Sequence, residues 1–286
     1  MGSSASSFAV RRRARLRELM LRPVTLFPIV ALPVPLAIAG QAITGRAGPA
    51  LAAGLLAPVG ITAWRMQQAT DQAEDAVMTE WGASHGLTFT DDLELPGDAP
   101  LLRAGDRRRA ENGLFALGEV NEGLIVCHYI YTVESRGSKG RRRSDDRTFT
   151  VCHLKVRGTG WSALPRLRLH RRGSLDPHFG DRLQAALTPE RLVQLESVEF
   201  NDAYKLFVSD NQDEVAVRAF FTPAAAVWLV EQAPPGFMFE MELNTLVAAL
   251  PGRVRDPGLL DALLDSARRV ANHIEQFHAY EETTVR

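Results

Sequence analysis

Two long apolar segments near the start of the chain dominate its pattern of hydrophobic and polar positions. Pro23–Ile43 and Ala47–Trp64 contain no acidic or basic residue, and only Thr44-Gly45-Arg46 separates them. A helix needs about 20 apolar residues to cross a bilayer, so the first segment is long enough and the second is at the lower limit. The pattern predicts a transmembrane helical hairpin over residues 23–66.

A basic run before the first segment predicts the orientation of this hairpin. Six arginines lie within residues 11–22, and the positive-inside rule keeps such a tail in the cytoplasm. Two crossings then return the chain to the cytoplasm at Arg65. We therefore predict a basic cytoplasmic tail over residues 1–22, two passes through the cell membrane, and both termini in the cytoplasm.

Two other interpretations of the first segment stay open. The arginine-rich start, the apolar middle and Ala37-Ile38-Ala39 also fit a cleaved signal peptide. Pro28, Pro33 and Pro35 remove helical hydrogen bonds that lipid cannot replace, so the first span is either kinked or part of a shallow re-entrant hairpin.

Beyond the apolar segments, the pattern alternates between helical and strand-like stretches. Gln67–His85 carries small and apolar residues at helical spacing, which predicts a connecting helix over residues 67–86. Leu124–Glu134 and Arg147–Arg157 are rich in β-branched and aromatic residues, which predicts a long β-hairpin. Residues 91–112 are rich in Asp, Gly, Pro and Arg and are predicted to be mostly loop.

The second half of the chain predicts further strands and two helices. The strands are Leu167–His170, which reads as short and exposed, Lys205–Ser209, Phe237–Leu243 and Thr245–Leu250. Thr222-Pro223 begins a helix that runs to Ala233, and Asp256-Pro257 begins a long amphipathic helix. Residues 87–286 are therefore predicted to form a cytosolic α+β domain with an antiparallel sheet and a long C-terminal helix.

Net charge, cysteine content and the absence of cofactor motifs exclude some classes of protein. The formal net charge of −1 argues against a dedicated nucleic-acid-binding protein. The only two cysteines, Cys127 and Cys152, lie in strand-like apolar runs, so they resemble small buried hydrophobic residues of a reducing compartment. We find no glycine-rich phosphate loop or other cofactor motif, so no cofactor is predicted.

The repeat Cys127-His128 and Cys152-His153, one pair on each arm of the long hairpin, provides the candidate catalytic residues. Neighbouring strand residues point to opposite faces, so the four side chains cannot converge on a zinc ion and no metal site is predicted. A cross-strand nucleophile pair, for example Cys127 facing His153, is allowed, but no third group to orient the histidine is identifiable. We interpret the four residues as packing, with a reactive pair as the alternative.

A cationic cluster lies at the tip of the same hairpin. It consists of Arg136, Lys139, Arg141, Arg142 and Arg143. An anchored domain holds such a tip near the cytosolic leaflet, where each cation is worth about 1 kcal/mol beside anionic lipid. We predict these as binding residues for lipid headgroups or a protein partner, and the alternative is a tip that stays solvated. No aromatic platform is interleaved with them, which argues against nucleic-acid binding.

Two other charged stretches suggest weaker sites. Alternation in Arg166–Arg172 places Arg166, Arg168 and His170 on one face, which favours an edge strand protected by cations, with an anion site as the alternative. The acidic residues of the next stretch match no calcium loop. They are Glu196, Glu199, Asp202, Asp210, Asp213 and Glu214.

Four short motifs occur in a fixed order in the second half of the chain. They are Leu195–Asn201, Tyr204–Asp210, Phe221-Thr222-Pro223 and Phe237–Glu240. In this order they resemble a bacterial family, the domain of unknown function number 3137. Phe221 stands where the family has leucine, and Ala224-Ala225-Ala226 stands where it has a methionine. The resemblance implies a membrane hairpin before a cytosolic domain, hence a bacterial inner membrane, and it implies no activity or catalytic residue.

The leading hypothesis is a membrane-anchored, non-enzymatic protein whose cytosolic domain binds a protein partner or anionic lipid headgroups. The alternative is a membrane-tethered enzyme that uses the cross-strand Cys/His pair. Small residues in the apolar segments also permit a homo-oligomer through close helix packing. They are Gly40, Ala47, Gly48, Ala52, Ala53 and Gly54.

Overall fold

The computed structural model of the chain describes residues 4–21, 47–116, 123–136, 142–156, 166–173 and 190–284. Internal contacts divide the chain into two compact units, Met1–Glu80 and Trp81–Arg286. The first predicted membrane segment, Pro23–Ile43, lies outside the described residues.

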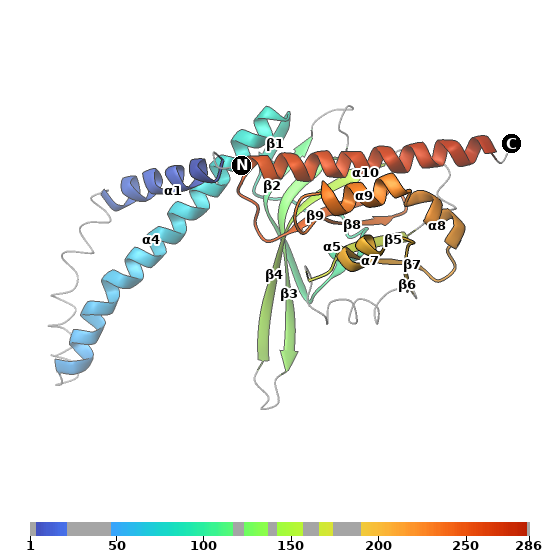
Figure 1. The fold of residues 1–286 in the computed structure, drawn as a ribbon. Helices are drawn as coiled ribbons and strands as arrows, with labels where there is room; N and C mark the ends of the chain where they lie inside the picture. The colour runs from blue at the N-terminus through green and yellow to red at the C-terminus, as the bar shows by residue number, and fades with distance from the viewer. Residues whose placement is uncertain are drawn as a thin grey trace. The chain divides into compact units, whose positions relative to one another are not determined.

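Two helices make up the described part of the first unit. The predicted basic tail is helical as α1 (Ser4–Leu21), and α4 (Ala47–Ser84) is one continuous helix whose last turn belongs to the second unit. The second predicted span, Ala47–Trp64, and the predicted connecting helix are thus parts of a single element (Figure 1). Among the described residues, no helix is both long enough and apolar enough to span a membrane. The transmembrane hairpin therefore stays a prediction.

The second unit is built on a large antiparallel sheet, which confirms the predicted α+β class. The described residues contribute nine strands in the order β1-β2-β3-β4-β9-β8-β5-β7-β6. The strands are β1 (Leu87–Thr90), β2 (Arg107–Ala116), β3 (Ile125–Arg136), β4 (Arg142–Lys155), β5 (Arg166–Arg171), β6 (Glu190–Val193), β7 (Tyr204–Ser209), β8 (Met238–Glu242) and β9 (Thr245–Pro251). Both predicted hairpins, now β3–β4 and β8–β9, are confirmed.

Five helices of the second unit accompany this sheet in the described residues. They are α5 (Pro100–Arg103), α7 (Val198–Ala203), α8 (Glu214–Phe220), α9 (Pro223–Glu231) and α10 (Pro257–Thr284). The predicted start of α9 is confirmed, because the Thr222 side chain accepts a hydrogen bond from the Ala225 amide and Pro223 occupies the first turn. The long C-terminal helix is also confirmed, as α10.

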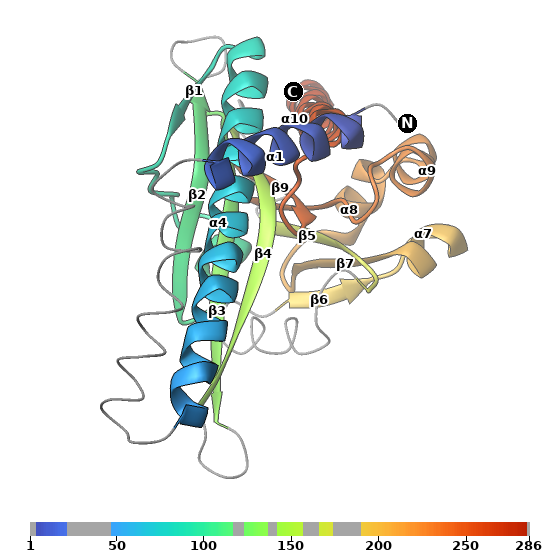
Figure 2. The ribbon, with the colours of Figure 1, turned by 90° about the vertical axis from the view of Figure 1, so that its left-hand side faces the viewer.

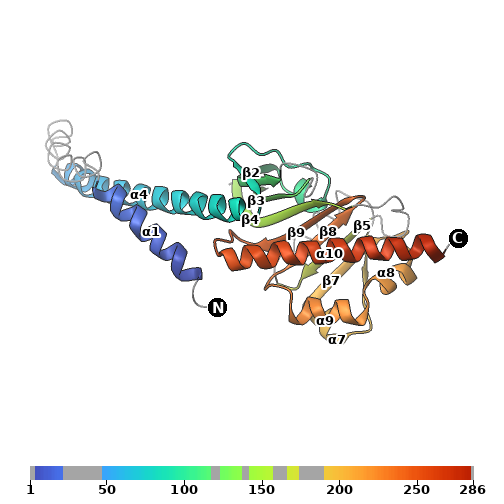
Figure 3. The same ribbon diagram turned by 90° about the horizontal axis from the view of Figure 1, so that it is seen from above.

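Side chains cover both faces of the sheet. α10 runs across one face, over β9 and β4 (Figures 1 and 3), and buries the apolar stripe Leu260, Leu263, Leu264, Ala267, Val270 and Ile274. On the other face, α5 and its neighbours pack against Cys127, Tyr129, Phe149 and Val151 of the β3–β4 hairpin. A sheet with two covered faces can bury the cysteines completely.

The predicted loop over residues 91–112 is wrong at its end, because β2 begins at Arg107. Arg107-Arg108-Arg109 shows no apolar alternation that would indicate a strand. Pairing with β3 holds this end of β2, together with ion pairs from Arg107 to Glu134 at 3.0 Å and from Arg109 to Asp146 at 3.3 Å.

The predicted exposed edge strand Leu167–His170 is also wrong. It forms the centre of β5, an interior strand that pairs with β7 on one side and β8 on the other, and all four residues are buried. The physical reason lies in the acidic residues that its cations meet.

Candidate functional site

The cysteines of the β3–β4 hairpin lie in an environment that does not activate a thiol. Cys127 is opposite Val151 and His153 is opposite Ile125, so the facing Cys127–His153 pair that we considered does not form. Both cysteines are fully buried. Burial raises the pKa of the Cys127 thiol, and burial raises that of Cys152 to about 12. A thiol kept neutral in this way is a poor nucleophile.

His128 and His153, the two histidines beside the cysteines, contact residues of β2 and of the loops that border the sheet. The His128 ring lies between the side-chain oxygen of Asn112 at 3.3 Å and the carbonyl of Val254 at 3.2 Å. The His153 Nδ1 is 3.1 Å from the carbonyl of Gly123, and its Nε2 is 3.4 Å from Asp98. Within the described ranges, no group of three or more His, Cys, Asp or Glu side chains is arranged to hold a metal ion.

The β3–β4 hairpin extends past its neighbours in the sheet (Figures 1 and 2). The described register pairs β9 with β4 only from Phe149 onward, and β2 with β3 only as far as Thr132. Beyond these points, Val133–Arg136 and Arg142–Asp145 have only each other as strand partners in the described register, and Glu134 is also held from the side by Arg107. We call this two-stranded extension the basic arm.

Positive charge gathers at the end of the basic arm. Residues 133–145 contain five cations and two carboxylates, Glu134 and Asp145, a net charge of +3. Arg142 and Arg143 are exposed, and Arg143 makes a surface ion pair with Asp145 at 3.1 Å. Arg136 and Arg142 are directly opposite in the last described pair of the arm, a like-charge arrangement that destabilises a hairpin. The side chain of Arg136, and Lys139 and Arg141 entirely, lie outside the described residues.

The second basic stretch, Arg166–Arg172, lies in the opposite environment, because its central residues are buried. Arg166, Arg168 and His170 do share one face of β5, but that face meets acidic residues rather than water. Arg166 pairs with Glu242, and the His170 Nε2 is 2.9 Å from Glu240. Arg168 pairs with Glu190 of β6 and stacks over Phe207, 5.0 Å from the ring centre. These three side chains of β5 are therefore paired with internal acidic residues and do not protect an edge.

Glu240 lies at the centre of this buried cluster. It also accepts a hydrogen bond of 2.6 Å from the Leu101 amide. Burial raises the pKa of Glu240, but the hydrogen bond and charge of His170, the charge of Arg168 and the Leu101 amide outweigh it and bring the pKa below its usual range. Glu240 is therefore ionised in the folded protein at neutral pH.

Part of this cluster has unused hydrogen-bonding capacity. Arg168 is only 1% exposed, yet its Nε and Nη1, and Oε1 of Glu190, have no partner among the described residues. Buried waters commonly satisfy such groups. The cluster therefore fits an internal polar network, and we assign no ligand to it.

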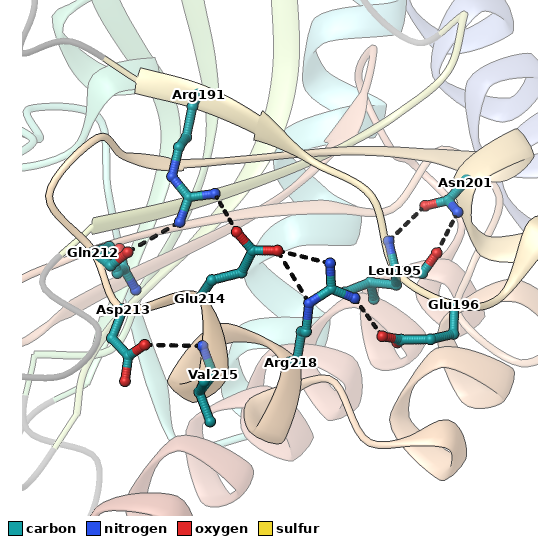
Figure 4. Close-up of polar contacts among 9 residues, drawn as sticks. All are labelled: Arg191, Leu195, Glu196, Asn201, Gln212, Asp213, Glu214, Val215 and Arg218. Atoms are coloured by element: carbon teal, nitrogen blue, oxygen red, sulfur yellow. Dashed lines mark hydrogen bonds and ion pairs between the residues drawn. The ribbon is translucent and has the colours of Figure 1, made fainter.

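Two of the six acidic residues of the stretch 196–214, Glu196 and Glu214, pair with arginines (Figure 4). Arg218 joins Glu214, at 2.7 Å, to Glu196. Arg191 is 3.2 Å from Glu214 and also donates to the Gln212 carbonyl. Asp213 caps α8 by accepting a hydrogen bond from the Val215 amide. These contacts give Glu196, Asp213 and Glu214 local structural roles.

A further feature was not found from the sequence. A cleft of about 500 Å³ lies between α8–α9 and α10, lined by Phe220, Trp228 and Phe239 and by Arg268 and Arg269. The adjacent aromatic pair Phe220-Phe221 and the adjacent cationic pair Arg268-Arg269 were visible signals. Their spacing along the chain does not show that the two pairs border one cleft.

Comparison with known proteins gives little further guidance. No protein-family model matches the chain, and no curated protein matches it. Among solved structures, it is similar to the crystal structure of the mycobacterial trehalose monomycolate transport factor A, TtfA, at 16% identity and a TM-score of 0.44. The match covers 70% of this chain and 94% of that chain. A similarity this low carries no inference about function.

Proposed function

We propose that this is a membrane-anchored, non-enzymatic binding protein of a bacterial inner membrane. Its anchor is the predicted hairpin at Pro23–Trp64, with both termini and the second unit in the cytoplasm. The basic tail, the paired apolar segments and the resemblance to the domain of unknown function number 3137 support this placement. The buried, unactivated thiols of Cys127 and Cys152 favour a binding role over the enzyme alternative.

We infer further that the basic arm contacts anionic lipid headgroups. The observation that carries this inference is the pairing of Arg136 with Arg142 at the end of strands that extend past their neighbours. Opposed like charges destabilise the free arm. An anionic surface would relieve that repulsion and attract each cation by about 1 kcal/mol. The arm combines its extension past the sheet with a net charge of +3 over residues 133–145.

Lipid contact is tested on the full chain in nanodiscs. Cys127 and Cys152 are buried, so a single exposed cysteine at Ser144 would carry an environment-sensitive dye. We expect blue-shifted emission in nanodiscs that contain phosphatidylserine and not in phosphatidylcholine alone. The combined substitutions Arg141→Glu, Arg142→Glu and Arg143→Glu should abolish the shift, and salt should weaken it.

Single charge reversals provide the matched control. Arg142→Glu should reduce the shift, whereas Lys205→Glu, at an exposed cation of β7, should not. Equal emission in the two lipid compositions would show that the arm does not touch headgroups. An acidic protein partner would then be the candidate ligand of the same residues.

Anchoring and the enzyme alternative are tested by thiol labelling. A cysteine at Thr44 should react with an impermeant reagent added outside the cell, and a cysteine at Ser138 should not. Labelling at residue 138 would show that the second unit lies outside the cytoplasm and that the predicted topology is wrong. Cys127 and Cys152 should resist modification until denaturant is added, and ready reaction of either in the folded protein would reopen the enzyme hypothesis.

A further inference from the structure

The cleft between α9 and α10 has the size and lining of a small-molecule site. Its volume of about 500 Å³ lies within the 300–1,000 Å³ that is typical of ligand pockets. Phe220, Phe221 and Trp228 form its aromatic wall and Phe239 of β8 contributes from the sheet. These four side chains are 2–8% exposed, so the edges they present to the cleft are apolar and held in place.

Hydrogen bonding and ring packing fix the geometry of this wall. The His273 Nε2 donates to the carbonyl of Phe220 at 2.7 Å and so ties α10 to the end of α8. The His273 ring also packs against the Phe220 ring, with centroids 4.7 Å apart, and Phe220 packs edge-on against Phe221 at 5.0 Å. A site held in this way is preformed, which lowers the entropic cost of binding.

Two adjacent cations line the α10 side of the cleft. The guanidinium of Arg269 lies over the Trp228 ring, 4.6 Å from its centroid. Arg269 is exposed, and no hydrogen bond or ion pair joins it to the residues that the structure describes. Stacking uses the face of a guanidinium and leaves the N–H donors at its edge available. Arg268 and Asp265 line the same cleft, so its formal charge from these three residues is +1.

We propose that this cleft binds a small aromatic carboxylate. The aromatic ring would pack against the edges that Trp228 and the phenylalanines present to the cleft, where edge-to-face ring pairs are favourable beyond simple burial. The carboxylate would accept two parallel hydrogen bonds from Arg269, the geometry for which a guanidinium is suited. The site is separate from the basic arm and does not depend on its role.

Calorimetric titration of the full chain in nanodiscs, with empty nanodiscs subtracted, tests the proposal. The probes are 2-naphthoate, its neutral amide, the cation 2-naphthylmethylammonium and the aliphatic anion octanoate. We expect saturable binding of 2-naphthoate, roughly tenfold weaker binding of the amide, and no detectable binding of the ammonium probe. Octanoate should bind more weakly than 2-naphthoate, because it lacks a ring to pack on Trp228.

Three variants locate the binding to the cleft. Arg269→Gln should weaken 2-naphthoate binding roughly tenfold and remove the preference for the anion over the amide. Ala225→Trp would fill the cleft from α9 and should abolish binding, whereas Val227→Trp, at an exposed position of the same helix, should not. Melting temperatures show that each variant is folded, and Arg269→Gln alone still decides the matter if Ala225→Trp does not fold.

Several results would overturn the proposal. They are the absence of saturable 2-naphthoate binding, equal affinity for the carboxylate and the amide, octanoate binding as tight as 2-naphthoate, and binding that survives in folded Ala225→Trp. Loss of the lipid-dependent dye shift would not bear on it, because no residue of the cleft belongs to the basic arm.

Discussion

The basic arm and strand β5 contain similar residues and place them in opposite environments. Arg142 and Arg143 are exposed at the end of a two-stranded extension. Arg168 and His170 are 1% and 6% exposed in the middle of the sheet. The difference comes from the surrounding strands. Glu240 lies opposite Arg168 on the adjacent β8, and Glu190 reaches Arg168 from β6, one strand beyond β7, while the end of the arm has another arginine opposite. Whether a cation of this sheet is buried in an ion pair or exposed to solvent thus depends on the residues of the surrounding strands.

The two environments also imply different energetic roles. A buried ion pair with one partner removed leaves an uncompensated charge, which costs about 3–5 kcal/mol. A surface ion pair such as Arg143–Asp145 contributes about 0–1 kcal/mol. Arg168 should therefore matter mainly for folding stability, and the arginines of the arm mainly for what the surface attracts.

The largest expected effect is from Arg168→Ala. Removal of this guanidinium leaves the Glu190 carboxylate buried without its partner, so the free energy of unfolding should fall by about 3–5 kcal/mol. Denaturant unfolding of the detergent-solubilised full chain measures it. Arg143→Ala is the matched control and should change stability by less than about 0.5 kcal/mol. Equal effects of the two substitutions would abolish the distinction between the two regions.

The combined substitution of both partners sharpens the same distinction. Arg168→Met with Glu190→Met removes both charges and keeps much of the volume, so it should recover most of what Arg168→Ala loses, to within about 1–2 kcal/mol of the parent. Unfolding curves of Arg168→Met, Glu190→Met and the double variant give the coupling free energy of the pair. A double variant no more stable than Arg168→Ala would mean that packing over Phe207, rather than charge, makes Arg168 important.

The loss of folding stability at acidic pH should come in part from Glu240 in the buried cluster around β5. The folded-state pKa of Glu240 is depressed, so its contribution to stability is fully present above the ordinary carboxyl pKa and is lost as the pH falls through the folded-state value. Glu240→Gln should lower stability near neutral pH by about 1–3 kcal/mol and flatten the decline at acidic pH. Unfolding free energies measured from pH 7 downward would show it.

An exposed carboxylate provides the control for this pH experiment. A hydrogen bond to its own backbone amide and another from Arg218 also lower the pKa of Glu196, but solvent screens an exposed group. Glu196→Gln should therefore leave the acid profile close to that of the parent. An unchanged profile in Glu240→Gln would mean that other groups dominate acid unfolding.

The sequence predicted the elements whose signals are local. Two segments rich in β-branched and aromatic residues identified the β3–β4 hairpin. Thr222-Pro223 identified the start of α9, because the N-cap hydrogen bond joins Thr222 to an amide only three residues away. The environment of β5 was not predictable in this way. The alternation of Arg and Leu is the same whether the polar face meets water or meets Glu240 and Glu242, which lie far along the chain. The cleft was missed for a similar reason, because it requires α10 to pack beside α9.

The smallest expected effect concerns the repulsion at the end of the basic arm. Arg142→Thr replaces one of two opposed arginines with a residue that favours strands, so in the absence of anionic lipid it should raise the free energy of unfolding by about 0.2–1 kcal/mol. The same substitution should reduce the lipid-dependent shift of a dye at residue 144. Higher stability together with a smaller dye shift in Arg142→Thr would mean that Arg142 lowers the stability of the arm and strengthens its contact with the lipid surface. A loss of stability in Arg142→Thr would instead mean that residues of the arm neutralise Arg142, and the electrostatic argument for lipid contact would fail.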